Sequence, residues 1–199
     1  MRLNEHGYWE GTDVGCEHAF DDRLAKALAS FFIAEKASSV ADLGCGLGEY
    51  VKLFKENGLN AVGYDGNPQT PALTNGLCEV LDLALPVAWA TPVSWVMSLE
   101  VGEHLPQDFE DTFVANLHHN NQHGIVLSWA VESQGGYGHF NERSNAYIKS
   151  KICKLGYTND VAAEEALREA STLWWFKNTI MVFRPSSSAR ERDATAMVP

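Results

Sequence analysis

The segment VADLGCGLG at residues 40–48 decides how this chain folds. A short apolar run over residues 39–43 stops at three glycines in alternate positions, and residues 49–57 then resume a helical pattern that Gly58 closes. Because a backbone without Cβ atoms can approach a ligand closely, the glycines indicate a binding turn. The segment therefore predicts a strand, a ligand-binding turn and a helix in succession.

The same alternation continues in both directions from this turn. Apolar patterns predict helices at 21–36, about 107–119, about 142–154 and about 162–173, and strands at 60–64, 80–81, 94–98, 124–130 and 178–183. Strands that alternate with helices and read as nearly continuous apolar runs indicate a parallel sheet covered on both faces. We therefore expect an α/β fold in a single domain, with a polar, glycine-rich loop over 131–141 at a strand end where such sheets bind ligands.

The composition is that of a globular protein. Of the 199 residues 45% are hydrophobic and 21% are charged, which argues against a disordered, fibrous or repeat protein. The longest apolar runs span only a few residues and residues 1–7 are polar, so we expect neither a membrane span nor a signal peptide. The cysteines are widely spaced without a CxxC pair, which predicts a reducing, cytoplasmic location: Cys16, Cys45, Cys78 and Cys153.

The charge of the chain is negative and unevenly distributed. With 15 Lys and Arg against 26 Asp and Glu, the net charge is −11, and residues 1–110 alone hold 6 basic and 17 acidic residues. A basic surface that could follow a phosphate backbone is missing from this half, so we expect no nucleic-acid partner. The basic residues of 143–154 lie at roughly helical spacing and indicate a solvated helix face.

Three aspartates follow the ends of three successive predicted strands. Asp42 precedes the glycine turn, Asp65 ends the second strand and Asp82 ends the third. This set fits a ligand that contains adenosine, with Asp42 near a charged tail, Asp65 on the ribose hydroxyls and Asp82 on the adenine amine. The GxGxG spacing and the acid before it disfavour a dinucleotide, because that carboxylate would repel a pyrophosphate.

From about residue 39 to 130 the chain resembles class I S-adenosylmethionine-dependent methyltransferases. It is also similar to a narrower group of methyltransferase-like proteins, through YDGNP at 64–68, SLEVGEH at 98–104 and SWAVESQGGYGHFN at 128–141. The resemblance implies a Rossmann-like fold with a mostly parallel seven-stranded sheet, and S-adenosylmethionine as cofactor. The cofactor-binding residues expected on this basis are Tyr8, Trp9, Asp42, Gly44, Gly46, Gly48, Tyr64, Asp65, Gly66, Asn67, Asp82, Leu83, Ser98 and Glu100.

The resemblance also divides the chain and places the chemistry. Residues 1–38 are expected to form an N-terminal cap or lid with the first helix, 39–184 the methyltransferase domain and 185–199 a disordered tail. Glu100 would lie on the donor side, and His104 would be the general base or acceptor contact, with Glu103 and His139 as further catalytic candidates.

A divalent cation is a further expectation. The ExxEH string resembles the cation site of small-RNA 2′-O-methyltransferases, and ubiquinone-pathway O-methyltransferases carry a similar string; the ligands would be Glu100, Glu103, His104 and His139. The competing interpretation is a metal-free site, because residues 103 and 104 also begin a helix or contact substrate in members without metal.

Aromatic residues provide the remaining candidates. Tyr8 and Trp9 would either face the sulfonium or anchor a lid. Trp129 and Tyr137 are expected to wall the acceptor pocket, and the aromatic run 174–176 to lie in the core.

The sequence therefore predicts an enzyme that moves a methyl group to an oxygen or nitrogen of a small-molecule acceptor. Two alternatives stay open: a non-catalytic protein or partner subunit that binds S-adenosylmethionine or S-adenosylhomocysteine, and an NAD-dependent dehydrogenase. The acceptor, the pathway and the oligomeric state do not follow from the sequence, because pocket shape sets acceptor specificity.

Overall fold

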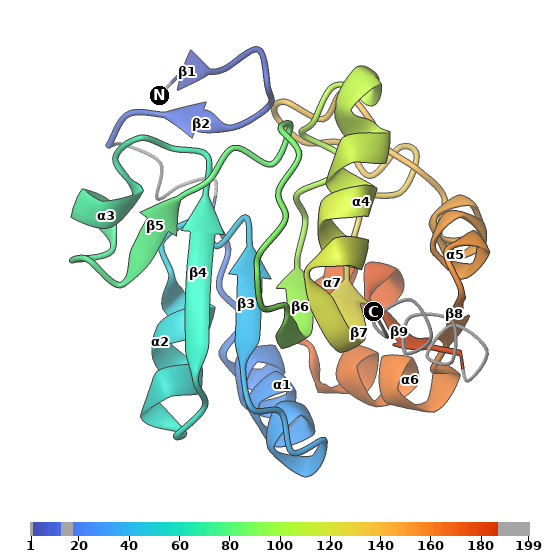
Figure 1. Ribbon diagram of the computed structural model, residues 1–199. Helices are drawn as coiled ribbons and strands as arrows, with labels where there is room; N and C mark the ends of the chain where they lie inside the picture. The colour runs from blue at the N-terminus through green and yellow to red at the C-terminus, as the bar shows by residue number, and fades with distance from the viewer. Residues whose placement is uncertain (1, 13–17, 187–199) are drawn as a thin grey trace, which may run out of the picture.

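The computed structural model describes residues 2–12 and 18–186, and Figure 1 shows a main sheet with helices on both faces and a separate N-terminal pair of strands. The sheet has seven strands in the order β5-β4-β3-β6-β7-β9-β8. Only β9 runs antiparallel to its neighbours, β7 and β8. This confirms the expected mostly parallel, seven-stranded α/β fold. The strands are β3 Val40–Leu43, β4 Ala61–Asp65, β5 Cys78–Val80, β6 Val93–Ser98, β7 Asn121–Leu127, β8 Tyr157–Asn159 and β9 Met181–Pro185.

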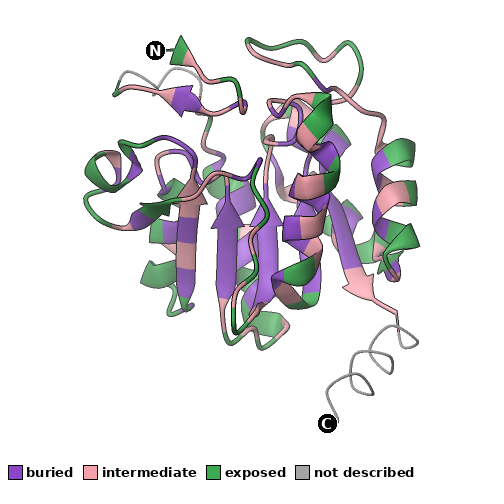
Figure 2. Ribbon diagram, turned by 45° about the horizontal axis from the view of Figure 1, so that its top comes forward, coloured by how far each residue is buried: buried purple, intermediate pink, exposed green. Residues whose placement is uncertain are grey.

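The two faces of the sheet bury separate apolar clusters. Side chains alternate along a strand, so Trp95 and Met97 of β6 pack toward one face while Val96 packs toward the other. The first face is covered by α1, α2, α6 and α7, and the second by α4 and α5. In Figure 2 the central strands are buried along most of their length, as near-continuous apolar strands require. The helices are α1 Asp22–Ala34, α2 Glu49–Glu56, α3 Thr70–Leu73, α4 Glu110–His119, α5 Asn145–Lys154, α6 Val161–Ala170 and α7 Trp174–Thr179, and the 3-10 helix η1 spans Gln107–Phe109.

A short N-terminal hairpin lies across the carboxyl ends of the parallel strands (Figure 1). Its strands β1, Arg2–Leu3, and β2, Trp9–Glu10, pair antiparallel. Gly7 between them approaches the backbone of His104 so closely that an added Cβ would lie 2.2 Å from the His104 carbonyl oxygen. The hairpin is therefore seated on the sequence that follows β6, at the edge where ligands bind in open α/β sheets.

Several predicted boundaries were wrong. The run 124–130 ends as a strand at Leu127, because Trp129 and Ala130 are buried by packing outside the sheet. The helix expected at about 142 begins at Asn145, and the one expected to 173 ends at Ala170. Strand β8 and helix α7 were not predicted.

Strand β9 extends through Pro185, so the tail cannot begin there, and residues 187–199 lie outside the described residues, as does Cys16. Within the described ranges, no helix combines the length and hydropathy needed to cross a membrane.

Candidate functional site

A cavity of about 330 Å³ opens at the carboxyl ends of β3, β4 and β6. Its walls come from the glycine turn, the strand ends, the N-terminal hairpin, the loop after β7 and helix α7. Segments far apart in sequence thus meet around one space, as expected at the point where the strand order reverses. Predicted site residues that line it are Tyr8, Trp9, Asp42, Gly44, Gly46, Asp65, Gly66, Asp82, Leu83, Glu100, His104 and His139.

The glycine turn is held by the neighbouring strand. The N–H groups of Gly44 and Cys45 donate to the Tyr64 carbonyl oxygen at 2.7 and 2.9 Å. The N–H of Gly46 donates to Asp65 Oδ2 at 2.9 Å. Gly44 has φ +85°, and an added Cβ would lie 2.3 Å from Val101 Cγ2. Glycine is therefore required there both by the backbone conformation and by the space available.

The three strand-end aspartates lie in different environments. Asp65 accepts from Gly46 and, at 3.0 Å, from the N–H of Asn67. Asp42 is only 3% exposed, and its burial raises its pKa well above the usual range. Asp82 accepts from the N–H of Ala84 through Oδ1 and lies 2.6 Å from His6 Nδ1 through Oδ2.

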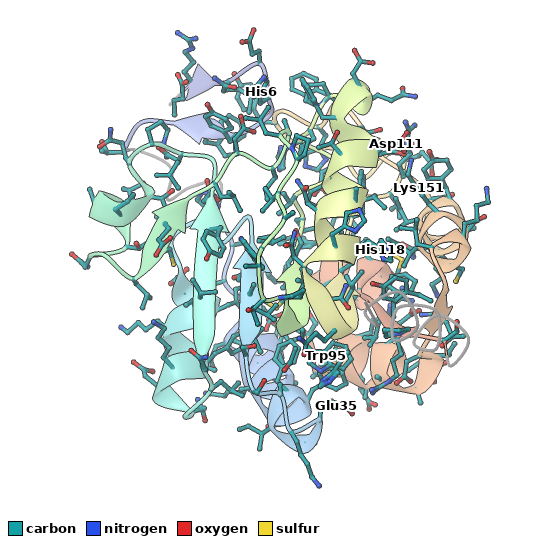
Figure 3. All side chains as sticks on the ribbon, viewed as in Figure 1. His6, Glu35, Trp95, Asp111, His118 and Lys151 are labelled. Carbon is teal, nitrogen blue, oxygen red and sulfur yellow. The ribbon has the colours of Figure 1, made fainter. Side chains whose placement is uncertain are left out.

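His6 comes from the N-terminal hairpin, and Figure 3 shows it above the sheet beside that hairpin. Its ring also meets the edge of Phe109 at a centroid distance of 4.9 Å. The hairpin therefore closes over the end of the cavity that Asp82 lines, by a contact that the sequence did not indicate.

Four expected cofactor residues and one catalytic candidate do not line the cavity. Gly48 packs near Cys78, the Tyr64 ring lies 5.2 Å from that of Trp89, and Ser98 donates to the Leu43 carbonyl oxygen. These residues support the turn and the strands from behind. The five are Gly48, Tyr64, Asn67, Ser98 and Glu103.

At the other end of the cavity, Glu103, His104 and His139 form a compact group. One ligand atom from each of the three lies within 4.8 Å of the others. Glu103 is fully buried, and within the part of the chain that the structure describes neither of its carboxylate oxygens has a hydrogen-bond partner. Burial, followed by the charge of Glu100, raises the pKa of Glu103 well above its usual range. Such a group either keeps its proton or holds a cation.

The His104 ring is uncharged near neutral pH. Burial, and then the neighbouring His139, lower the pKa of His104 to about 4. Its Nδ1 lies 3.1 Å from the carbonyl oxygen of Gly138, which can only accept, so Nδ1 carries the proton. The Nε2 lone pair is therefore available to accept a proton or bind a cation.

Glu100 is not part of that group. It has φ +54°, a conformation that costs free energy in a residue other than glycine. Gln134 Nε2 donates to Glu100 Oε2 at 2.6 Å, and Thr179 Oγ1 donates to Oε1 at 3.2 Å. Glu100 thus links the loop after β7 to the end of α7, and its side chain lines the cavity.

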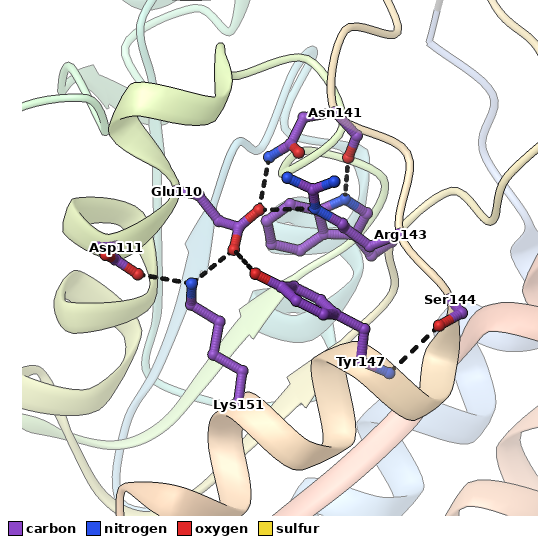
Figure 4. Close-up of polar contacts among 8 residues, drawn as sticks. Glu110, Asp111, Asn141, Arg143, Ser144, Tyr147 and Lys151 are labelled. Atoms are coloured by element: carbon purple, nitrogen blue, oxygen red, sulfur yellow. Dashed lines mark hydrogen bonds and ion pairs between the residues drawn. The ribbon is translucent and has the colours of Figure 1, made fainter.

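A second buried glutamate anchors the end of the loop that carries His139. Figure 4 shows Glu110 at the start of α4 as the acceptor for Asn141, Arg143, Tyr147 and Lys151. Burial opposes its ionisation, but these hydrogen bonds prevail and the pKa of Glu110 is about 2. Four donors around one carboxylate fix the position where the loop joins α5.

Aromatic residues surround the same end of the cavity. Trp9 and Tyr137 stack with ring centroids 5.3 Å apart, and Trp9 also meets the edge of His104 at 5.9 Å. Tyr137 lines the cavity as expected, whereas Trp129 is buried behind it. The expectation that residues 174–176 belong to the core was wrong for Trp174, which is 55% exposed; the three residues line the cavity from α7.

Sequence reasoning missed the contacts made by His6, Gln134 and Thr179. They belong to no motif, and each contacts a residue that is distant in sequence. His6 contacts Asp82, and Gln134 and Thr179 both contact Glu100. No local pattern could have identified them.

Comparisons with known proteins find relatives only among solved structures. No family model matches the chain, and no curated protein matches it. Magnesium protoporphyrin IX methyltransferase from Synechocystis PCC 6803, with bound SAH, superposes with a TM-score of 0.62 at 16% identity, over 81% of this chain and 82% of that chain. A TehB-like SAM-dependent methyltransferase from Corynebacterium glutamicum gives 0.61 at 14% identity, over 88% and 93%.

The methyltransferase domain of bacterial CtHen1-C gives a TM-score of 0.58 at 16% identity, over 83% of this chain and 98% of that chain. At these identities the likeness concerns the fold. The chain has the Rossmann-like fold of class I methyltransferases.

Proposed function

We propose that this protein is an S-adenosylmethionine-dependent methyltransferase that acts on an oxygen or nitrogen atom of a small molecule. The observation that carries the proposal is one cavity with two unlike ends. The glycine turn and strand-end aspartates form one end, and His104 and His139 line the other, next to the buried Glu103. A reaction that joins a nucleoside-based donor to a second molecule needs this arrangement.

The donor would occupy the end formed by the glycine turn. Asp65 would accept hydrogen bonds from the ribose hydroxyls, and Asp82 would accept from the adenine amine. Asp42 would lie near the charged tail of the donor. Tyr8 packs against Gly66, where an added Cβ would lie 2.4 Å from the Tyr8 ring, so the hairpin would close the donor end.

The charge of the cavity restricts the acceptor. Among the described residues that line it, none is Lys or Arg, whereas five are acidic: Asp42, Glu49, Asp65, Asp82 and Glu100. A phosphate or carboxylate on the acceptor would find no Lys or Arg among these residues to pair with. The aromatic side chains beside His104 suit a flat, apolar body. We therefore expect an acceptor that is uncharged or cationic and small.

The reaction would be an in-line displacement at the sulfonium. The acceptor oxygen or nitrogen forms a bond to the methyl carbon, the carbon–sulfur bond breaks, and S-adenosylhomocysteine leaves. The acceptor proton would pass to His104 Nε2, which is unprotonated near neutral pH. The chain's main contribution would be to align the two substrates and to exclude water.

A divalent cation at Glu103, His104 and His139 is the second candidate for this end of the site. It is favoured by the Glu103 carboxylate, which is buried beside two imidazoles and has no hydrogen-bond partner among residues 2–12 and 18–186. Two imidazoles and a carboxylate suit Mn, Fe or Zn. A bound cation would lower the pKa of an acceptor hydroxyl. His104 would then be a ligand and not the base.

Calorimetric titration with S-adenosylhomocysteine tests the donor site. We expect micromolar binding and a loss of about 100-fold in Asp65→Ala, which removes a charged acceptor. Glu56→Ala, at the exposed end of α2, is the matched control and should bind as the wild type does. Absence of binding in the wild type would overturn the proposal, and binding of NAD in a parallel titration would favour a dehydrogenase.

Two further measurements separate the remaining alternatives. Titration with Mn²⁺, compared between the wild type and Glu103→Gln, tests the cation. Transfer of a labelled methyl group to a panel of phenols and amines tests catalysis. Donor binding without transfer to any acceptor would favour a non-catalytic binding protein.

A further inference from the structure

Glu142 joins the loop after β7 to His139, and sequence reasoning did not select it. Its Oε2 accepts from the N–H of Ser133 at 2.8 Å, and its Oε1 accepts from the N–H of Gly135 at 2.8 Å. The same Oε1 lies 3.1 Å from His139 Nδ1. One carboxylate thus receives three donors from a span of seven residues.

These contacts determine which ring nitrogen of His139 carries the proton. An ionised carboxylate can only accept, so the hydrogen bond requires a proton on Nδ1. The N–H groups of Ser133 and Gly135 already donate to this carboxylate, so it is the acceptor in its contact with His139 as well. In a neutral His139 ring, Nε2 is then left with a lone pair.

The ring also lies against a residue that has no side chain. A Cβ at Gly136 would lie 2.3 Å from His139 Nε2, so any other residue at 136 would displace the ring. The His139 side chain is 12% exposed and its ring meets that of His104 at a centroid distance of 4.9 Å. The place of the ring is thus fixed by Gly136 and His104, and its proton by Glu142.

We propose that Glu142 is a positioning residue that holds His139 in the Nδ1–H form, with the Nε2 lone pair free to serve the reaction. A carboxylate that accepts from the far nitrogen of a functional histidine is a general means of fixing its form and orientation. The inference rests on the proposed function only in that His139 takes part in the reaction. The hydrogen-bond geometry stands independently of it.

The form of the ring can be measured directly by long-range proton–nitrogen NMR on protein labelled with ¹⁵N-histidine. The spectra detect the carbon-bound ring protons and distinguish Nδ1–H from Nε2–H, and His139→Gln assigns the signal. At pH 8, without ligands, we expect the Nδ1–H form in the wild type. In Glu142→Ala we expect the signal to move to the Nε2–H form or to a mixture.

Glu132→Ala is the matched control, because Glu132 is an exposed glutamate of the same loop, and its spectrum should match that of the wild type. S-adenosylhomocysteine affinity, measured on each variant, reports whether the donor end is still folded, and we expect a change of less than about twofold. If Glu142→Ala does not fold, Glu142→Gln keeps the shape and removes the charge.

An Nε2–H ring in the wild type would overturn the inference, and so would an unchanged Nδ1–H signal in a folded Glu142→Ala. Neither result depends on donor binding. Failure of the wild type to bind S-adenosylhomocysteine would instead count against the proposed function and leave the assignment of the proton intact.

Discussion

The two ends of the cavity are built in different ways. At the end where we propose that the donor binds, backbone groups of one short turn bond to the adjacent strand, and the contacts join residues 44–46 to residues 64 and 65. At the end where we propose that the acceptor binds, Glu100 contacts Gln134 and Thr179, which lie 34 and 79 residues away, and the His104 ring meets that of His139. The first is a property of the fold, and the second is a network that each sequence must assemble for its own acceptor.

The largest expected effect is a loss of stability when the hydrogen bonds that support the acceptor end are removed. Glu110→Met removes the carboxylate that accepts from four side chains, two of them cationic. Breaking a buried, paired charge costs about 3 kcal/mol of unfolding free energy. Urea unfolding measures the loss. At urea concentrations where the variant is folded, its affinity for S-adenosylhomocysteine should be unchanged, because the donor end does not use this cluster. Equal losses of unfolding free energy and binding free energy would contradict the division into two ends.

The next largest effect is a loss of ligand affinity when the glycine turn at the donor end is distorted. In Gly44→Ala the new Cβ meets Val101 Cγ2 at 2.3 Å in a backbone with φ +85°. We expect S-adenosylhomocysteine affinity to fall by about 100-fold, since the turn must shift and overpacking costs about 1–3 kcal/mol. Calorimetric titration measures the change.

Gly58→Ala is the control for Gly44→Ala. Gly58 has a similar φ of +81°, but an added Cβ would have nothing within 4 Å. It should lose about 1 kcal/mol of stability through strain and keep its affinity. If the two variants bind S-adenosylhomocysteine equally, the close approach at Gly44 has no role in the donor end.

The same difference explains which features the sequence predicted. The glycine turn and Asp65 were predictable because the interacting residues occur in short patterns at strand ends. The apolar run 124–130 led to a strand prediction that was too long. Trp129 lies beyond the end of the strand, where its side chain is buried and its Nε1 donates to the Asn141 carbonyl oxygen at 2.6 Å. Trp174 was misassigned because an aromatic run indicates burial, whereas here a short helix leaves Trp174 exposed beside the cavity.

Replacing Glu103 by Met should change the unfolding free energy by less than Glu110→Met does, and in the opposite direction. Its folded-state pKa is raised, so the folded state binds the proton more tightly than the unfolded state, and stability falls as pH rises above about 4.5. Glu103→Met removes the unpaired carboxylate and should raise the unfolding free energy at pH 8 by about 1–2 kcal/mol without added metal.

The gain from Glu103→Met should shrink at pH 5, where the wild type keeps its proton. Thermal unfolding at the two pH values measures it. A loss of stability at pH 8 would show that the carboxylate has partners after all. Added Mn²⁺ should stabilise only the wild type if the group binds a cation.

The smallest effect concerns the contact between the hairpin and the donor end. His6 Nδ1 lies 2.6 Å from the Asp82 oxygen that we assign to the adenine amine, and both side chains are about a quarter exposed. A partly exposed pair contributes on the order of 0.5–1 kcal/mol, so releasing Asp82 in His6→Ala should strengthen S-adenosylhomocysteine binding by about threefold. His119→Ala, at the far end of α4, is the control and should leave affinity unchanged.

The sign of the change in affinity separates two roles of the hairpin. If the His6 contact competes with the donor, its removal gives tighter binding, whereas if the hairpin contacts the bound donor, its removal gives weaker binding. Weaker binding in His6→Ala would therefore indicate that His6 contacts the bound donor and does not compete with it. The donor end would then depend on a contact from a distant segment, as the acceptor end does.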